Sequence, residues 1–577
     1  MIKKLTENKR ILTCLYFLIL AGVALIASLP AFRNGIYNGH DLWFHMGRIE
    51  AIDTELSNGQ FPVRFETTGW YGNGYISTTM YGNIFLYVPA LLHMAGVATY
   101  RCYNIYVILT NIIGVAIAAF SFKGIFKDRR WALLATSTYM LAGYYISNVY
   151  MRAAVGEYTA MIFIPLLVYG IYHILFDDNH DGLIRTTLPL VIGTTGIIES
   201  HILTTVMVAL AVFVFLIIYL KTTIGHIKEL LFALVMIVCL NAFFLVPFLD
   251  SYTSYDFNAS VGTAGENIQK FGLYLDQVFG LFPEGSGSMY EWTSAGEEYT
   301  KLGVVHVVAF ALMILTIILK KKLAPTNTSF KRIISIFVIG LIAAWLSSAY
   351  FPWGIFAGDN ALSNIMRSVQ YPSRYLVIQT ICWTLCGTYA LRAFVEAIKP
   401  DKQAITYGLA IICIGMLALA QTGWFMYTLS CRNYTIQTIE GRDNFADGLY
   451  LQVGTDTSDL ATEAALLEGD DCTVQDLGYS KGVRQILIDN ESTESATVLV
   501  PIFNFKYIRA FDSAGTEYQL ESTDGNQYQV QVPAGFNDTL SVKFVAPFAW
   551  RFSEGVTLIT LLAIIFVPAL KRGRKGV

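Results

Sequence analysis

Residues 11–29 read ILTCLYFLILAGVALIASL, a run without a charged side chain. The hydrocarbon core of a bilayer is about 30 Å thick, and roughly 20 apolar residues in a helix span it. The run is longer than the apolar stretch of a signal peptide, which has about 7–15 residues, so we expect a retained anchor. This stretch therefore predicts a membrane-spanning helix.

The composition agrees with a membrane protein. The chain has 577 residues, of which 54% are hydrophobic and 14% charged, and its mean hydropathy is +0.49. A soluble domain carries about 25% charged residues. High apolar content argues against disorder, a net charge of −3 against a nucleic-acid-binding surface, and eight cysteines against a disulfide scaffold.

Further apolar stretches follow the first one. Together they predict a polytopic α-helical membrane protein with about twelve transmembrane helices. The predicted spans are 11–29, 104–122, 132–148, 158–175, 186–199, 202–220, 230–249, 302–319, 333–350, 375–392, 404–424 and 553–570.

The orientation follows from the basic residues, because Lys and Arg gather in short cytoplasmic loops. We assign the segments between the predicted spans to alternating sides of the membrane, starting with a cytoplasmic N-terminus. With this assignment, 23 of the 40 basic residues fall on the cytoplasmic side. These are Lys3, Lys4, Lys9, Arg10, Lys123, Lys127, Arg129, Arg130, Arg185, Lys221, Lys228, Lys320, Lys321, Lys322, Lys331, Arg332, Arg392, Lys399, Lys402, Lys571, Arg572, Arg574 and Lys575. We therefore predict that both termini are cytoplasmic.

Two regions need a special assignment to keep this pattern. Residues 83–98 are apolar, but counting them as a span would invert every later loop, so we interpret them as a membrane-surface or re-entrant helix on the outer face. Arg185 and Lys221 both lie inside only if the chain turns back near residues 199–201 at the outer side.

Three outer segments are long: 30–103, 250–301 and 425–550. The last alternates polar and apolar residues, as in QYQVQVPAG from residue 527, between turn signals such as Asp524-Gly525-Asn526, which predicts a small β-sandwich. We divide the chain into a transmembrane domain 1–424, a β-rich domain 425–550, and a last helix with a basic tail, 551–577. Cys431 and Cys472 permit a disulfide in the β-rich domain but do not require one.

The stretch GHDLWFHMGRIE, residues 39–50, carries the first candidate site residues. A helix that begins at Asp41 places Asp41, His45 and Arg48 on one stripe beside an apolar stripe, which predicts an amphipathic helix on the outer leaflet. The alternative is that Asp41 only caps the helix and that Arg48 extends to lipid headgroups. In a chain with so few charges, we favour a functional site.

Three further polar groups lie on the same predicted side. Arg152 and Glu157 stand at the start of a span, where a carboxylate also suits the helix dipole. Glu199 and His201 form a polar pair that a simple interhelical hydrogen bond would explain equally well. Arg374 follows Pro372 at a helix start and could bind a phosphate, or anchor the helix at the interface.

These stretches resemble a family. GHDLWFHMGRIEAIDTELSNGQFPVRF, RAAVGEYTAMIFIPLLVYGIY, LYLDQVFGLF, VQYPSRYL, VPIFNFKYIRAFDSAG and APFAWR are similar to the bacterial YfhO-like and "6-pyruvoyl-tetrahydropterin synthase-related" membrane proteins of the GT-C glycosyltransferase superfamily. The similarity covers most of the chain, and the first motif is its most specific part. Nothing in the chain resembles a soluble pterin enzyme.

The resemblance implies a GT-C-like fold in the bacterial cytoplasmic membrane with an extracytoplasmic active site. A sugar would move from a polyprenyl-phosphate donor to a glycan, lipid or protein acceptor in the cell envelope. Asp41 matches the family's first acidic position, as general base or acceptor-orienting carboxylate, and Glu157 matches the second. Arg374 matches a family arginine, although Ser373 stands where relatives carry an aromatic residue.

The substrate-binding residues expected with them are His45, Arg48, Arg152, Glu199, His201 and Arg374. The first loop lacks an Asp-x-Asp motif, so we expect chemistry without a metal and leave a divalent cation, Mg²⁺ or Mn²⁺, open. The outer segment 250–301, which includes FPEGSGSMYEWTSAGEEY, is a candidate mobile lid or acceptor-recognition loop.

Two other functions compete with glycosyl transfer. One is a transporter or flippase for lipid-linked sugars, although such proteins tend to carry charges at the bilayer midplane rather than at one face. The other is a non-catalytic scaffold of envelope assembly, with the β-rich domain as its binding module. The sequence does not identify the sugar, the acceptor or the stereochemical outcome.

Overall fold

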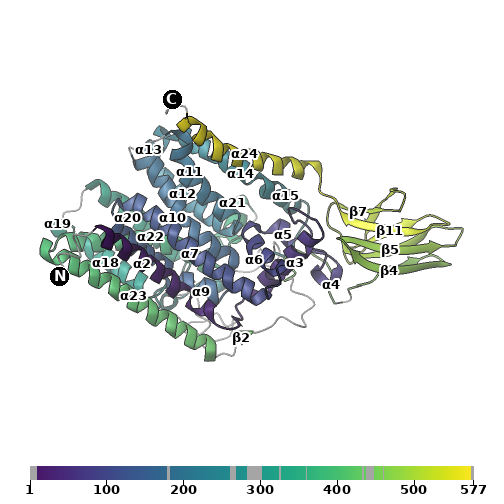
Figure 1. Cartoon of the computed structure of the whole chain (residues 1–577), viewed down its shortest axis with the longest axis horizontal. Coiled ribbons are helices and arrows are strands. Elements are labelled where there is room, and N and C mark those ends of the chain that lie inside the picture. The colour runs from purple at the N-terminus through teal and green to yellow at the C-terminus, as the bar shows by residue number, and fades with distance from the viewer. Residues whose placement is uncertain are drawn as a thin grey trace.

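The computed structural model describes residues 9–177, 182–259, 268–281, 302–323, 327–358, 360–431, 435–436, 447–458 and 460–573. Its larger part is a bundle of helices, and a β-domain projects from one end of that bundle (Figure 1). The bundle helices are α2 (Lys9–Ser28), α7 (Thr99–Phe126), α8 (Arg129–Met140), α9 (Gly143–Tyr150), α10 (Val155–Phe176), α11 (Leu183–Ile198), α12 (Ile202–Ile218), α13 (Leu220–Gly225), α14 (Ile227–Leu240), α15 (Ala242–Tyr252), α18 (Val304–Ile318), α19 (Lys320–Leu323), α20 (Asn327–Leu346), α22 (Leu376–Glu396), α23 (Pro400–Cys431) and α24 (Phe548–Gly573).

Short elements connect the bundle helices. They include η1 (Leu29–Phe32), β1 (Ile36–Tyr37), α3 (Leu42–Ser57), α4 (Gly69–Gly72), α5 (Ser77–Met80), η2 (Ile84–Leu86), α6 (Tyr87–Met94), η3 (Ile268–Phe271), α17 (Leu275–Val278), η4 (Trp353–Phe356), α21 (Ala361–Arg367), η5 (Pro372–Tyr375) and β2 (Thr435–Ile436). The predicted surface or re-entrant segment 83–98 is thus two short helices, η2 and α6, and α6 packs on α3 and α7.

The described residues contain six helices that are long and apolar enough to cross a membrane. They are Arg10–Phe32, Thr99–Phe126, Val155–Phe176, Ser329–Leu346, Lys402–Tyr427 and Phe548–Phe566, and the bent pair α14–α15 makes a seventh if it is one span. Four shorter apolar helices lie at Ile84–Met94, Leu183–Ile198, Ile202–Ile218 and Val304–Ile318. The polytopic helical class is supported, whereas the predicted count of twelve spans is not confirmed.

Two predicted spans are interrupted. The stretch 132–148 forms α8 and α9, because Ala142 adopts an extended backbone (φ −60°, ψ 139°) between them. The stretch 230–249 bends by 72° between α14 and α15. At this bend the Asn241 side chain donates to the Ile237 carbonyl (2.6 Å) and to Thr195 Oγ1 (3.0 Å), and such local bonds compete with regular helix.

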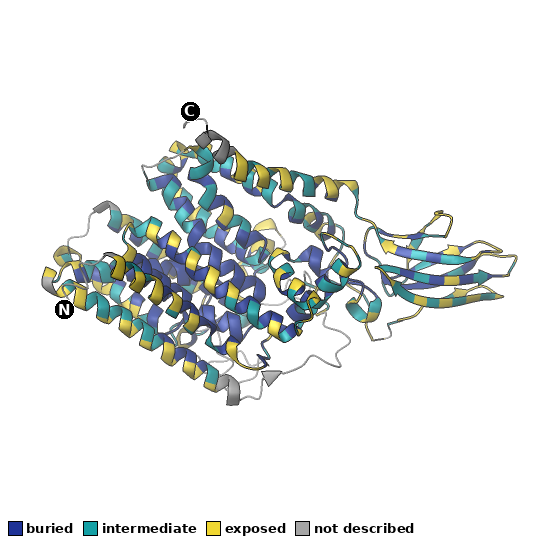
Figure 2. Cartoon of the chain, viewed as in Figure 1, coloured by how far each residue is buried: buried dark blue, intermediate teal, exposed yellow. Residues whose placement is uncertain are grey.

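Burial divides the bundle into inner and outer helices. Side chains of α8, α9, α10 and α22 are mostly buried, whereas α2, α23 and α24 expose many apolar side chains along the rim (Figure 2). A water-soluble surface would carry charge at these positions, so the exposed apolar rim fits contact with lipid.

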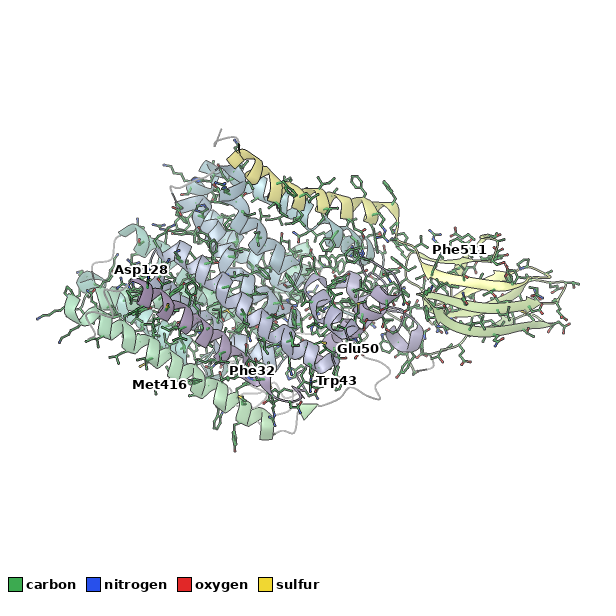
Figure 3. All side chains as sticks on the ribbon, viewed as in Figure 1. Phe32, Trp43, Glu50, Asp128, Met416 and Phe511 are labelled. Carbon is green, nitrogen blue, oxygen red and sulfur yellow. The ribbon has the colours of Figure 1, made fainter. Side chains whose placement is uncertain are left out.

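The segments that the charge count assigns to one side meet at one end of the bundle. Arg392, near the end of α22, donates to the carbonyl of Phe126 at the end of α7 (3.4 Å). Figure 3 labels Asp128 at this end and Trp43 at the opposite end. Two of the basic segments therefore lie together, whereas the alternation of the other segments and the end that faces the cytoplasm stay predictions.

The C-terminal domain is a pair of antiparallel sheets, as the alternating sequence predicts. One sheet has the order β3-β6-β10-β9 and the other β4-β5-β11-β7-β8. Val530 lies opposite Val498 in the first, and Leu540 opposite Ile486 in the second, so both sheets turn buried aliphatic residues inward. The strands are β3 (Ala465–Glu468), β4 (Cys472–Ser480), β5 (Val483–Asn490), β6 (Ala496–Phe503), β7 (Ile508–Phe511), β8 (Glu517–Tyr518), β9 (Leu520–Ser522), β10 (Gln527–Val532) and β11 (Asn537–Phe544).

The thiol at position 472 is free. Cys431 ends α23, and nothing is described of its side chain, so the disulfide expectation has no support among the described residues.

The β-domain packs directly on the first outer loop. Phe65 and Tyr75 from that loop share one apolar core with Phe503 and Phe505 of the β-domain. The buried guanidinium of Arg484 also donates one hydrogen bond to the loop, to the carbonyl oxygen at position 72 (3.0 Å). The β-domain therefore packs against the loop that follows α3, the helix that carries the first candidate site residues.

Candidate functional site

The first outer loop and the α9–α10 turn are joined through their backbones. The Asp41 amide donates to the Arg152 carbonyl at 2.9 Å. Gly39 permits this approach, because a Cβ there would lie only 2.5 Å from the Cβ of Ala153. Ala153 has φ +50°, a left-handed conformation that costs a non-glycine residue roughly 1–2 kcal/mol. The structure thus fixes Asp41 beside Arg152.

Glu157 lies at the centre of a buried set of donors. Its Oε1 accepts from the Tyr144 hydroxyl and from Asn148 Nδ2 (3.2 Å), and its Oε2 accepts from Arg152 Nη1 (2.6 Å). Arg374 Nε is 3.7 Å from the same Oε2. The side chain is 1% exposed. Both carboxylate oxygens are therefore already bound by the protein.

Arg374 is held at the start of α22 by its own chain. Its Nη1 donates to the Val369 carbonyl (2.9 Å) and to Gln370 Oε1 (2.8 Å). Gln370 has φ +66°, so a second left-handed non-glycine residue flanks a site arginine. The Nη2 groups of Arg374 and Arg152 make no hydrogen bond with any residue that the structure describes. Two donor groups are therefore free for a ligand.

Asp41 differs from Glu157 because its carboxylate accepts no hydrogen bond from any described residue. It occupies the N-cap position of α3, but its side chain makes no capping hydrogen bond, and no described residue donates to it. Burial raises the pKa of this carboxyl, although the charges of Arg152 and Arg374 lower it and that of Glu157 raises it again. The capping alternative is thus wrong, and Asp41 is a carboxylate with free lone pairs beside two cations.

Tyr81, at the end of α5, connects this group to the remaining residues predicted on α3. The guanidinium of Arg48 lies 4.5 Å from the centroid of the Tyr81 ring and donates to the Gly82 carbonyl (2.8 Å). The rings of His45 and His201 lie 5.7 and 5.8 Å from that of Tyr81. Burial, followed by the charge of Arg48, lowers the pKa of His45 well below its ordinary value, so His45 is neutral at pH 7.

Two expectations for α3 are wrong. Arg48 is 2% exposed, so it does not extend to lipid headgroups, and His45 is 1% exposed, so the helix does not lie on the membrane surface as an amphipathic helix would. The reason is the cover supplied by Tyr81 and Gly82, which follow α5. This cover comes from residues far along the chain.

The sequence did not predict that Asp447 and Tyr450, which precede the first strand of the β-domain, lie at the site. The Tyr75 hydroxyl donates to Asp447 Oδ1 (2.8 Å), and the Tyr450 amide donates to the Tyr75 hydroxyl (3.0 Å). Burial raises the pKa of Asp447, and the nearby charge of Asp41 adds to this effect. No local pattern marks Asp447 or Tyr450, because their place at the site follows from a contact across hundreds of residues.

The predicted pair Glu199 and His201 divides between two environments. His201 faces Tyr81, and its Nδ1 accepts from the Thr204 amide (3.3 Å) at the start of α12. Glu199 is 3% exposed, and neither carboxylate oxygen has a hydrogen-bond partner among the residues that the structure describes. Its nearest cation is Arg64, which does not belong to the Asp41 group. The structure therefore brings His201 to the site and leaves Glu199 apart.

Two further expectations concern a metal ion and the outer loop 250–301. Among the described residues, no group of three or more His, Cys, Asp or Glu side chains could hold a metal ion. Of the candidate lid or acceptor loop, residues 250–301, the structure describes 250–259 and 268–281, and the stretch 282–301 lies outside the described residues.

Gly156 provides a test of the packing at this site. A Cβ at this position would lie 2.0 Å from the Tyr81 hydroxyl and 2.7 Å from the Ser200 carbonyl oxygen. Overpacking costs about 1–3 kcal/mol, so Gly156→Ala should lower the free energy of unfolding by that amount. Gly415→Ala is the matched control, because no atom lies within 4 Å of its added Cβ. Chemical unfolding in detergent measures the free energy of unfolding of both variants. An equal value for the two would contradict the close packing at Gly156.

Comparison with known proteins gives limited similarity. No family model matches the sequence. A protein of Lactococcus lactis subsp. cremoris (strain MG1363), described only as uncharacterized, is 22% identical over 349 residues, which are 59% of this chain and 54% of that protein. The chain thus spans about half the length of this curated relative.

Among solved structures, the cryo-EM structure of the arabinofuranosyltransferase AftD from Mycobacteria is similar to this chain. The TM-score is 0.39 and the identity 12%, over 71% of this chain and 27% of AftD. The YfhO-like resemblance is not confirmed by either similarity. A TM-score this low carries no argument about activity, so a functional conclusion has to come from the site.

Proposed function

We propose that the chain is a membrane glycosyltransferase that moves a sugar from a polyprenyl-phosphate donor to an acceptor in the cell envelope. The observation that carries this proposal is the carboxylate of Asp41. It accepts no hydrogen bond from any described residue, and it lies beside Arg152 and Arg374, whose Nη2 groups are free. A base next to phosphate-binding cations is the arrangement that glycosyl transfer from a lipid phosphate requires.

In this proposal the Asp41 carboxylate accepts the proton of the acceptor hydroxyl. The hydroxyl oxygen then bonds to the anomeric carbon, the bond from that carbon to the phosphate oxygen breaks, and the lipid phosphate leaves with the electron pair. Arg374 and Arg152 stabilise the charge that develops on this phosphate, since planar guanidinium groups bind phosphate oxygens well.

Glu157 has a supporting role in this mechanism. Both of its oxygens are bound by the protein, and it is the counter-charge for Arg152 and Arg374. We therefore propose that Glu157 positions the arginines and does not touch the acceptor. Tyr81, with the neutral His45 and with His201 beside it, forms an aromatic wall that suits contact with a sugar ring.

The test is transfer by the purified full-length chain in lipid nanodiscs. A panel of polyprenyl-phosphate sugars is supplied with envelope extract as acceptor, and release of free polyprenyl phosphate is measured. Release that depends on acceptor supports the enzyme. Movement of intact donor between leaflets without release would instead support the transporter alternative.

The pH dependence of kcat/KM follows from the pKa of Asp41. The base must be ionised, and burial raises its pKa, so activity should fall about tenfold per pH unit below an acid limb that lies above the ordinary carboxyl value of about 4. Arg374 lowers this pKa, and Arg374→Gln should therefore move the limb to higher pH. A limb at pH 4 or below, or one unmoved by Arg374→Gln, would contradict the assignment.

A further inference from the structure

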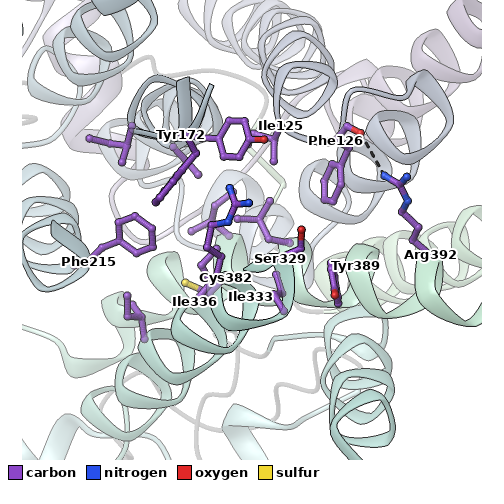
Figure 4. Close-up of a pocket in the computed structure, with 18 of the residues that line it drawn as sticks. Ile125, Phe126, Tyr172, Phe215, Ser329, Ile333, Ile336, Cys382, Tyr389 and Arg392 are labelled. Carbon is purple, nitrogen blue, oxygen red and sulfur yellow. Dashed lines mark hydrogen bonds between the residues drawn. The ribbon is translucent and has the colours of Figure 1, made fainter. Parts of the chain in front are cut away.

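A large cavity lies inside the helical bundle, away from the Asp41 site. Its volume is about 630 Å³, within the range of about 300–1,000 Å³ that is typical of small-molecule sites. Its walls come mainly from α10, α12, α20 and α22 (Figure 4). No residue assigned to glycosyl transfer lines it.

The cavity is long and apolar. Along α22 its lining extends from Ile378 to Glu396, and 18 residues of helix rise about 27 Å. At the end near Ile378, Ile164 and Ile339 contribute only aliphatic side chains. A cavity of this length with such walls fits an extended hydrocarbon chain better than a compact polar ligand.

Positive charges stand at the other end of the cavity. Lys322, Arg332 and Arg392 line it there, and Glu396 is the one acid among the described lining residues. Glu396 is occupied, because it accepts from Arg392 Nε at 2.7 Å. Two of the three cations therefore have no acidic partner in the lining.

Arg332 is the cation best placed for a ligand. Its guanidinium lies 4.8 Å from the centroid of the Phe176 ring, and its buried Nε has no hydrogen-bond partner in the described part of the chain. Lys320 and Lys321 extend the positive charge beyond the cavity on α19. This is the end of the bundle that the charge count predicts to be cytoplasmic.

We propose that this cavity binds one anionic phospholipid of the cytoplasmic leaflet. One acyl chain lies along α22, and the phosphate lies at Arg332 and Lys322. Basic pockets between transmembrane helices on the cytoplasmic side bind anionic headgroups, and arginine binds phosphate through paired donors. The proposal does not depend on glycosyl transfer.

The position of the charges favours this occupant over the lipid tail of a sugar donor. Arg374 does not line the cavity, so a donor held there would place its phosphate outside the apolar end, and its lipid tail would offer no anionic group to Arg332. An anionic phospholipid places its acyl chain at the apolar end of the cavity and its phosphate at the basic end.

The experiment is lipid binding to the purified full-length chain, measured by native mass spectrometry. Phosphatidylglycerol is titrated against phosphatidylethanolamine, and we expect the anionic lipid to bind more tightly. Arg332→Gln should weaken phosphatidylglycerol binding about tenfold, because it removes a charge-assisted contact. Lys321→Gln, a charge change on the same surface but outside the lining, should leave binding unchanged.

A second variant tests the chain-binding part of the cavity. Ile336→Trp fills the cavity without changing its charge and should also displace the lipid. Unfolding temperatures of all variants show whether a loss of binding comes from misfolding. Equal affinity for both lipids, or full binding by a folded Arg332→Gln, would overturn the proposal. Displacement of phosphatidylglycerol by polyprenyl phosphate in the wild type but not in an Arg374→Gln variant would also overturn it.

Discussion

Asp41→Asn should reduce sugar transfer by about 10²–10⁴-fold, the usual contribution of a general base. The substitution keeps the shape of the side chain and its place beside Arg152, but asparagine cannot accept the acceptor's proton. Because no described residue donates to the Asp41 carboxylate, the variant loses no hydrogen bond within the described part of the chain and should fold normally. Release of polyprenyl phosphate by the purified variant measures the effect.

The matched control is Asp53→Asn, the same change on the same helix. Asp53 binds His93 on α6 and lies away from the arginines, so this variant should keep near-normal transfer. If Asp41→Asn transferred sugar at the wild-type rate, the proposed base would be excluded. Equal losses in both variants would point to damage to α3 rather than to chemistry.

Glu157→Gln should lower the free energy of unfolding by about 3–5 kcal/mol. Removing one partner of a buried ion pair leaves an uncompensated charge, and here Arg152 and Arg374 both lose their counter-charge. The pair is well buried, with side chains that are 11% and 1% exposed. Chemical unfolding in detergent measures the loss.

Two further variants separate this effect from that of an ordinary ion pair. Glu517→Gln breaks the half-exposed pair with Arg509 and should cost less than about 1 kcal/mol. Adding Arg152→Gln to Glu157→Gln should restore part of the lost stability, since one of the unpaired charges is then removed. If Glu157→Gln and Glu517→Gln lowered the free energy of unfolding by the same amount, the buried ion-pair network would be contradicted.

The fold was predictable where the pattern is local. The alternation in QYQVQV places β10 at Gln527–Val532, and ATVLVPIF places β6 at Ala496–Phe503. The length of the apolar stretches alone predicted the helices of the bundle. It did not predict that the stretch 132–148 breaks at Ala142, because that extended residue follows from tertiary packing and leaves no sign in the composition.

The site was predictable in part for the same reason. Charge is so scarce in this chain that Asp41, Arg152 and Glu157 stand out in the sequence, and the structure brings them together. Tyr81 and Tyr450 could not be found in this way, because tyrosine is common throughout the chain. The burial of Arg48 was equally hidden, since its contacts with Tyr81 and Gly82 come from residues 33 and 34 positions further along the chain.

The most direct test of the proposed mechanism is a cryo-EM structure of the full chain in a nanodisc with polyprenyl phosphate. We expect the phosphate within about 2.7–3.2 Å of the Nη2 groups of Arg374 and Arg152, with the Asp41 carboxylate facing the open side of the phosphate. A phosphate bound elsewhere, with the space beside Asp41 empty, would contradict the assignment of this site to sugar transfer.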